Sequence, residues 1–363
     1  WMIKIFDLKE QYKRFGKVID KKVINILSSG NYILGENVAL FEEKTKKYLN
    51  GKYALSCNSG TDALVLSMRA LGVQTGDEII TTPFSYFATA ESISLVGAKP
   101  VFADINPHTF NINPKHITKL INKKTKAVLS VNLFGQACEL DNINKITKEH
   151  NIKHIEDCAQ SFGAVYNNKQ TGTYGDMGCY SFFPTKNLGC FGDGGLVVVK
   201  SKKNYDILKK LRTHGGIRRN QHDLIGYNSR LDEIQAAILN IKLNYLESFI
   251  KKRKKIAKIY FETINNDKLR LPFTYKKSVH TFNQFTLRVK NRRKLELHLK
   301  KNNIPYGIYY SMPIYKYNAY RNNKYESLPM VEKVSKECLS IPIYPELPIK
   351  YAIKISEVLN NYE

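Results

Sequence analysis

Short apolar runs alternate with helix-forming segments between about residue 51 and residue 199, and this rhythm constrains the fold more than any other feature of the chain. Most of the runs are separated by segments of helical period, such as 62–71 and 142–150. Alternation of this kind predicts an α/β fold with a mostly parallel sheet that helices cover on both faces. The sequence predicts seven strands, at Tyr53–Cys57, Glu78–Thr81, Pro100–Asp104, Ala127–Val131, His154–Asp157, Cys179–Phe183 and Leu196–Val199.

The length of 363 residues and a change of character from about residue 260 onward predict two domains, with the boundary near residue 245. We expect a large domain over 1–245, opened by a leader and two helices, and a smaller α+β C-terminal domain over 246–363. The boundary falls inside a helical pattern that we expect to run from Leu231 to Lys258.

A formal net charge of +25 is the unusual feature of the composition. Such a charge suits a nucleic acid, a membrane surface or an anionic substrate. Lysine greatly outnumbers arginine and is spread along the whole sequence, and the densest run, Lys251–Lys255, is typical of a solvated helix face. We therefore expect no nucleic-acid partner.

The six cysteines form no CxxC pair and no metal-ligand spacing, so we expect buried, reduced thiols and no metal site. The sequence contains no signal-peptide pattern and no apolar segment long enough to cross a bilayer. We therefore expect a soluble cytoplasmic protein without a membrane partner.

The segment Gly178–Gly195 carries the first candidate for chemistry. A strand-like run ends at Pro184, Lys186 follows two residues later, and a glycine-rich stretch comes next. A lysine just past a strand end is placed to point into a cleft, where partial desolvation lowers the pKa of its amine and lets it attack a carbonyl to form a Schiff base. Taken alone, Lys186 is more simply one of many surface lysines, so the assignment depends on its neighbours.

Ligands of a parallel sheet bind at the carboxyl ends of its strands, so the residues at each strand exit matter most. The first strand leads through Gly60 and Thr61 into a helix whose free amides favour a phosphate, although an ordinary helix cap explains the same residues. The second leads into an aromatic cluster with Tyr86, which is either core or a stacking platform. The fifth ends at Asp157, a buried acid that either pairs with a cation or caps the next segment.

Ser181 and Lys186 complete this set at the exit of the sixth strand. A phosphate site, an aromatic ring, a buried acid and a lysine would then share one edge of the sheet. Together they are the parts needed to hold pyridoxal phosphate.

Several motifs, in a fixed order and spacing, resemble one family over essentially the full length of the chain. They are Tyr32–Gly35, Asn58–Leu64, Gly76–Glu78, Glu156–Gln160, Ser181–Gly189, Asn228–Arg230 and Leu339–Glu346. In these motifs the chain is similar to the sugar aminotransferases of the DegT/DnrJ/EryC1/StrS family, which are fold type I enzymes that use pyridoxal 5'-phosphate. The resemblance implies a large cofactor-binding domain and a smaller α+β domain.

The resemblance implies a role for each candidate at the cofactor ring. Lys186 would bind the cofactor as a Schiff base and then move a proton during amino transfer. Asp157 would pair with the ring nitrogen, Gln160 would lie near the ring hydroxyl, and Tyr86 would stack on the ring face.

The resemblance also implies which residues bind the phosphate of the cofactor and how the subunits assemble. Gly60, Thr61 and Ser181 would bind the phosphate within one subunit. Asn228 would reach it from the other subunit, so the protein would be a homodimer with shared active sites. Two further residues match the family pattern near the substrate: His222 and Arg230.

The activity that the resemblance implies is a two-stage transfer from L-glutamate to a nucleotide-linked keto-sugar, through pyridoxamine phosphate. Members acting at C3 of a dTDP- or UDP-3-keto-hexose are the nearer match, ahead of those acting at C4 of a 4-keto-6-deoxy sugar. The product would enter a surface glycan such as O-antigen, lipopolysaccharide or capsule. The alternatives are an aminotransferase for a cyclitol or aromatic amine, a regulator that binds pyridoxal phosphate, and a basic nucleic-acid binder.

Two positions bear on membership within the family. Dehydratases of the family carry a histidine where this chain has Lys186, which argues against that activity. Many relatives carry a Pro-x-His step where this chain has Pro313–Tyr315, so substrate contacts from that loop are in doubt.

Overall fold

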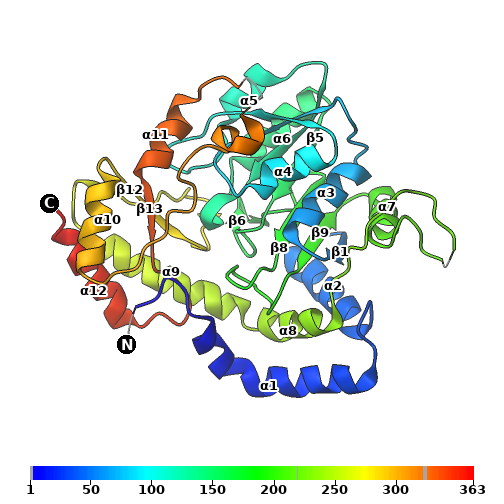
Figure 1. Cartoon of the computed structure of the whole chain (residues 1–363), viewed down its shortest axis with the longest axis horizontal. Helices are drawn as coiled ribbons and strands as arrows, with labels where there is room; N and C mark the ends of the chain where they lie inside the picture. The colour runs from blue at the N-terminus through cyan, green and yellow to red at the C-terminus, as the bar shows by residue number, and fades with distance from the viewer. Residues whose placement is uncertain (1–2, 219, 322–324) are drawn as a thin grey trace.

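A computed structural model describes residues 3–218, 220–321 and 325–363 of the chain (Figure 1). Its centre is a seven-stranded sheet in the order β1-β9-β8-β5-β4-β2-β3. Among these described strands only β9 runs in the opposite direction, so the other six end at the same edge. The strands are β1 (Tyr53–Cys57), β2 (Glu78–Thr81), β3 (Lys99–Phe102), β4 (Thr125–Val131), β5 (Lys153–Asp157), β8 (Met177–Ser181) and β9 (Gly195–Val199).

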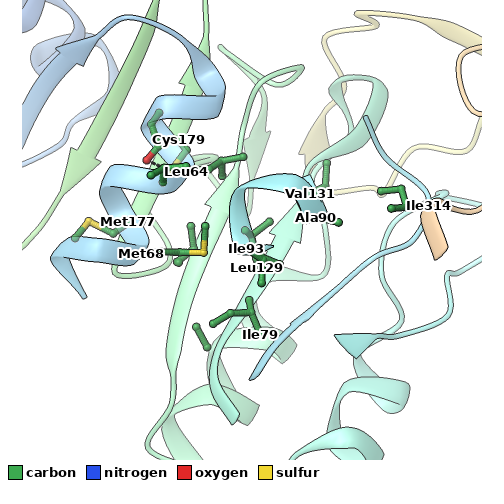
Figure 2. Packing of buried hydrophobic residues seen from close by; sticks show 14 of the residues in the cluster. Leu64, Met68, Ile79, Ala90, Ile93, Leu129, Val131, Met177, Cys179 and Ile314 are labelled. Atoms are coloured by element: carbon green, nitrogen blue, oxygen red, sulfur yellow. Dashed lines mark hydrogen bonds between the residues drawn. The ribbon is translucent and has the colours of Figure 1, made fainter. Parts of the chain in front are cut away.

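This sheet confirms the predicted fold class, and each strand lies within two residues of its expected bounds. Successive strand residues point to opposite faces, and helices cover both. One face packs against α3 (Gly60–Ala70), α4 (Ala88–Leu95) and α7 (Lys202–Arg212), and Figure 2 shows Leu64 and Met68 of α3 beside Met177 and Cys179 of β8. The other face packs against α2 (Glu36–Leu49), α5 (Pro114–Leu120), α6 (Leu140–Glu149) and α8 (Glu233–Leu243).

The N-terminal helix α1 (Leu8–Ser29) lies along the outside of the molecule beside α8 (Figure 1). It begins after Asp7, whose carboxylate accepts the amides of Lys9 and Glu10 at 3.1 and 3.4 Å. It ends at Gly30, which takes a φ of 72° that a residue with a side chain adopts at a cost.

The single helix expected from Leu231 to Lys258 is wrong, because two helices occupy this stretch. Helix α8 ends at Leu243, and α9 (Leu246–Thr263) begins after Tyr245, whose φ of −109° and ψ of 0° are not helical. The two helices separate because α8 packs on the central sheet, whereas most of α9 packs on the C-terminal sheet. The break lies at the domain boundary that the sequence predicts, and the division at residue 245 stays a prediction.

The C-terminal part holds a second sheet in the order β10-β12-β13, flanked by α9, α10 (Arg292–Lys301) and α12 (Ile349–Asn360). Its core is separate from that of the central sheet, but α11 (Pro329–Glu337) and the turns before it pack into the core of the central sheet. The remaining elements are β6 (Val165–Tyr166), β7 (Lys169–Gln170), β10 (Leu269–Arg270), β11 (Ser278–Val279), β12 (Phe285–Val289), β13 (Cys338–Ile341) and the 3-10 turns Leu133–Gly135, Ile314–Lys316 and Asn318–Tyr320.

Within the described ranges, no helix combines the length and the apolar character that crossing a membrane requires.

Candidate active site

The carboxyl ends of β1, β5 and β8 bring the predicted residues to one edge of the sheet. Cys57 of β1 and Ser181 of β8 both pair with Gly195 of β9, so these two strand exits lie in one row. Asp157, the last residue of β5, pairs with Cys179 of β8, two residues before Ser181. The exits of the three strands are therefore adjacent, as the sequence predicts.

Asp157 is buried, with 6% of its surface exposed, and two groups hold its carboxylate. The Ala159 amide donates to Oδ1 at 3.1 Å, and the Thr89 hydroxyl donates to Oδ2 at 3.0 Å. Burial raises the pKa of the carboxyl, and these two hydrogen bonds and the charge of Lys186 offset part of the rise. A carboxylate in this position is stabilised by any further cation that enters the pocket.

Lys186 lies in the turn after β8, where its amide donates to the Phe183 carbonyl at 2.9 Å. Burial lowers the pKa of its ammonium, and the negative charge of Asp157 counters that effect. The amine is therefore easier to deprotonate than that of a surface lysine, which is the condition for attack on a carbonyl. The charges of Lys186 and Asp157 therefore influence each other, and their shared role in a site stays a prediction.

The N-terminus of α3 forms a site for an anion beside Ser181. Ser59 caps the helix, and its hydroxyl accepts the Asp62 amide at 3.1 Å. The amides of Gly60 and Thr61 meet no acceptor among the described residues, so the cap leaves two donors free. A Cβ at Gly60 would lie 2.7 Å from the Cβ of Ser181, so only glycine lets the two strand exits approach this closely.

Gln160 is buried and its amide group joins two parts of the chain. Its Oε1 accepts the Phe134 amide at 2.7 Å, and its Nε2 donates to the Tyr310 hydroxyl at 2.8 Å. Phe134 takes a φ of 58°, which is costly for a residue with a side chain and aims its amide at Gln160. One N–H of Gln160 remains for another acceptor, so its predicted place near the ring hydroxyl stays a prediction.

The aromatic cluster after β2 divides into core and surface. Phe84 is fully buried and packs against the rings of Phe134 and Tyr310. Tyr86 is 67% exposed at the start of α4, so it is the member of the cluster that a ligand can reach. Its stacking role stays a prediction.

The described residues 213–218 and 220–228 leave the body of the molecule after α7 as a loop, here called the arm (Figure 1). Thr213 and Asn228 pair across its base, and Asn228 is exposed. His222 is exposed too, and its ring donates to the His214 carbonyl at 3.0 Å. Arg230 is half-buried, and no hydrogen bond in the described part of the chain links Asn228, His222 or Arg230 to Lys186.

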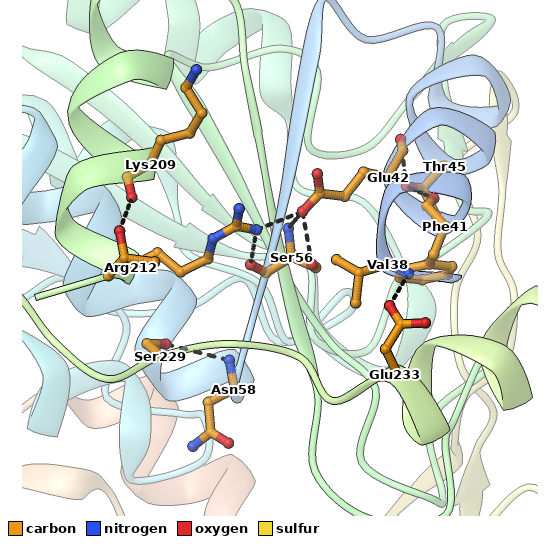
Figure 3. A network of polar contacts seen from close by, with 11 residues as sticks. Val38, Phe41, Glu42, Thr45, Ser56, Asn58, Lys209, Arg212, Ser229 and Glu233 are labelled. Carbon is orange, nitrogen blue, oxygen red and sulfur yellow. Dashed lines mark hydrogen bonds and ion pairs between the residues drawn. The ribbon is translucent and has the colours of Figure 1, made fainter. Parts of the chain in front are cut away.

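The base of the arm is fixed to the start of α3 by Ser229, which the sequence analysis did not single out. Its buried hydroxyl donates to Asp62 Oδ2 at 2.5 Å and accepts the Asn58 amide at 3.3 Å. Beside it, Arg212 donates to Glu42 at 2.6 Å and to the Ser56 carbonyl at 3.1 Å (Figure 3). The anion site and the arm therefore share one polar network.

Sequence reasoning missed Thr89 and Tyr310, which hold Asp157 and Gln160. Neither belongs to a motif, and both come close to their partners through tertiary packing. In the loop where relatives carry Pro-x-His, Tyr315 is buried and donates to Glu332 at 2.9 Å, so it supports α11.

Comparison with known proteins gives one consistent result. The profile of the family described as DegT/DnrJ/EryC1/StrS aminotransferase matches residues 14–360. A "Pleiotropic regulatory protein" of Geobacillus stearothermophilus is 39% identical over 350 residues, which cover 95% of this chain and 94% of that protein. A "UDP-2-acetamido-2-deoxy-3-oxo-D-glucuronate aminotransferase" of Pseudomonas aeruginosa is 39% identical over 346 residues, which cover 95% of this chain and 96% of that protein.

Among solved structures, Streptomyces venezuelae DesV "in complex with ketimine intermediate" superposes with a TM-score of 0.97 at 33% identity. The match covers 99% of this chain and 98% of that one. The likeness therefore extends over both sheets.

Proposed function

Because the chain belongs to the DegT/DnrJ/EryC1/StrS aminotransferase family, we propose that it transfers an amino group from L-glutamate to a nucleotide-linked keto-hexose, with pyridoxal phosphate as cofactor. The observation that carries this proposal is that Lys186 lies within electrostatic reach of the buried Asp157, at the same sheet edge as the start of α3. Amino transfer with this cofactor requires an amine, an acidic group and an anion site close to one another.

The residues at this edge fit the proposed cofactor. The free amides of Gly60 and Thr61, with the hydroxyl of Ser181, suit a phosphate, and the close approach at Gly60 leaves the helix end open to it. Asp157 suits a protonated ring nitrogen because a buried carboxylate is stabilised by a cationic partner. When bound, pyridoxal phosphate supplies a reactive aldehyde and a ring that accepts electrons.

Lys186 serves first as the amine that captures the cofactor and then as a base and acid. Because burial lowers the pKa of its Nζ, the amine loses its proton more readily than that of a surface lysine. Nζ can therefore take a proton from the substrate carbon and return it to a neighbouring atom. Thr89 and the Ala159 amide keep the Asp157 carboxylate in place during these transfers.

We place the amino group at C3 of a dTDP- or UDP-linked 3-keto sugar, ahead of C4, because the Pseudomonas relative is named for a 3-oxo substrate. The product would serve surface-glycan synthesis in the cytoplasm. The Geobacillus relative is named as a regulatory protein, and we favour an enzyme instead because a lysine with a lowered pKa and a buried aspartate near it suit amino transfer.

We propose a homodimer in which the arm of one subunit reaches the active site of the other. The arm presents Ile225 with 96% and Ile217 with 64% of their surfaces exposed, and such apolar side chains gain by burial against a second subunit. Asn228 would complete the phosphate site of the partner, and His222 and Arg230 would lie near its substrate.

The experiment is an absorbance and turnover assay on the purified protein. Pyridoxal phosphate should give a yellow protein that L-glutamate bleaches, and a panel of 3-keto and 4-keto nucleotide sugars should restore the colour. A protein that stays colourless after reconstitution would refute the cofactor. Faster restoration by 4-keto sugars would move the amino group to C4.

A further inference from the structure

Two side chains of α8, Gln235 and Lys242, hold the backbone of the loop that follows Lys186. They are seven residues apart and so lie on the same face of the helix. Gln235 Oε1 accepts the Phe191 amide at 2.9 Å, and Lys242 Nζ donates to the Gly189 carbonyl. Helix α8 is therefore hydrogen-bonded to the loop at Gly189 and at Phe191, three and five residues after Lys186.

Lys242 is an unusual residue at this position because it is almost completely buried. Only 1% of its surface is exposed, its ammonium lies 5.2 Å from the centre of the Phe191 ring, and it forms no ion pair with a described residue. Burial lowers the pKa of this ammonium to about 8. A methionine would fill the same space without a buried charge, so packing alone does not account for a lysine here.

The turn that carries Lys186 is fixed from its other side by the C-terminal part of the chain. Asn187 donates to the Thr281 hydroxyl at 2.7 Å and accepts from Asn283 at 3.1 Å. The fully buried Arg253 donates to the Asn283 carbonyl at 3.3 Å and so supports that contact. Beyond Gly189 the loop is tied back to the strand end, where the Cys190 amide donates to the Phe182 carbonyl at 2.8 Å, and the contacts of Gln235 and Lys242 from α8 are its side-chain hydrogen bonds from a remote element in the described structure.

We propose that Lys242 is a positioning residue for Lys186: its ammonium holds the Gly189 carbonyl and keeps the neighbouring amine directed into the pocket. The inference rests on the proposed function only for the role of Lys186, because the hydrogen bonds between α8 and the loop form without any cofactor. Cys190 of the loop and Glu346 of the C-terminal part are the titratable groups that interact with Lys242.

The test is hydrogen–deuterium exchange over residues 182–194 in the wild type and in Lys242→Met, followed by reconstitution with pyridoxal phosphate. Lys242→Met removes the donor and keeps the length of the side chain. We expect exchange of this segment to become at least ten times faster and covalent capture of the cofactor at least ten times slower. Lys242→Gln, which keeps a donor, should recover part of both losses and serves if the methionine variant does not fold.

Leu239→Ala is the matched control, because Leu239 is a fully buried residue of α8 with no polar contact to the loop. This control should speed exchange broadly without a specific effect on 182–194. Wild-type exchange of 182–194 in Lys242→Met would overturn the proposal, and so would a broad increase like that of the control. If the wild type captures no cofactor, the proposed function fails. A specific change in exchange of residues 182–194 in Lys242→Met would still show that Lys242 holds the loop.

Discussion

At the scale of single residues, burial at the same site shifts the pKa values of Lys186 and Asp157 in opposite directions. Burial lowers the pKa of Lys186 and raises that of Asp157, and each charge opposes the shift of the other. A lysine that loses its proton more readily than usual therefore lies within electrostatic reach of a carboxylate that a cation would stabilise, before any ligand binds. This pair is the part of the site with the most direct chemical consequence.

Lys186→Ala should lower the rate of amino transfer by at least about a thousandfold, because it removes both the nucleophile and the proton carrier. Circular dichroism should show an unchanged fold, since the turn is held by its backbone and by Asn187. Turnover with a keto-sugar is the measurement. The exposed Lys153→Ala is the control, and near-normal turnover of Lys186→Ala would refute the assignment.

Lys242 gives the protein a pH-dependent stability with a defined sign. Its folded pKa of about 8 lies below the ordinary value of 10.5, so between these values the unfolded chain binds more protons than the folded one. The free energy of unfolding should therefore rise with pH across this window, by up to about 3 kcal/mol relative to Lys242→Met. Urea unfolding of both proteins from pH 7 to 10.5 measures the difference, and parallel pH profiles would contradict it.

At the scale of elements, the site depends on how closely α3 approaches the exit of β8. The helix begins where β1 ends, and Gly195 of β9 pairs with both neighbouring strand ends. Two amides of α3 and the hydroxyl of Ser181 meet only because Gly60 has no side chain. The anion site is thus a property of the contact between elements.

Gly60→Ala should weaken binding of pyridoxal phosphate by at least tenfold and lower the free energy of unfolding by about 1–3 kcal/mol, since the new Cβ would lie 2.7 Å from that of Ser181. Absorbance titration and thermal unfolding give the two values. Ser201→Ala, which removes the cap of α7, should cost about 1 kcal/mol of stability and leave cofactor affinity unchanged. Wild-type affinity in Gly60→Ala would count against a phosphate site at α3.

At the scale of the whole molecule, the arm stands out because it projects from the body of the molecule beyond α7 (Figure 1). Its base is tied through Ser229 to Asp62 in the first turn of α3. The arm exposes apolar side chains that no described residue covers, with Ile225 at 96% and Ile217 at 64%. This arrangement suits a second copy of the chain better than an isolated protomer.

Ile225→Asp should shift the protein from dimer to monomer and lower turnover at least tenfold, because a charge would replace an apolar contact between subunits. Analytical ultracentrifugation measures the state of association, and turnover is assayed at the same concentrations. Ile353→Asp on α12, at a residue that is 42% exposed, is the control and should stay dimeric. A monomeric, fully active wild type would contradict the shared active site.

The sequence by itself determined the seven strands, the helices on both faces and the edge at which Lys186, Asp157 and the start of α3 meet. Periodicity and strand order suffice for this, because the carboxyl ends of parallel strands must share an edge. It did not locate the break at Tyr245, since only the diverging packing of α8 and α9 requires one.

Only the tertiary structure decided which side chains support the site. Thr89 reaches Asp157 from a position 68 residues away, Tyr310 reaches Gln160 across 150 residues, and Lys242 reaches Gly189 across 53. No local pattern marks such residues, because their roles arise from distances in space. Chain direction alone fixes which strand ends meet, whereas the burial and orientation of each supporting group depend on the packing of elements that are remote in sequence.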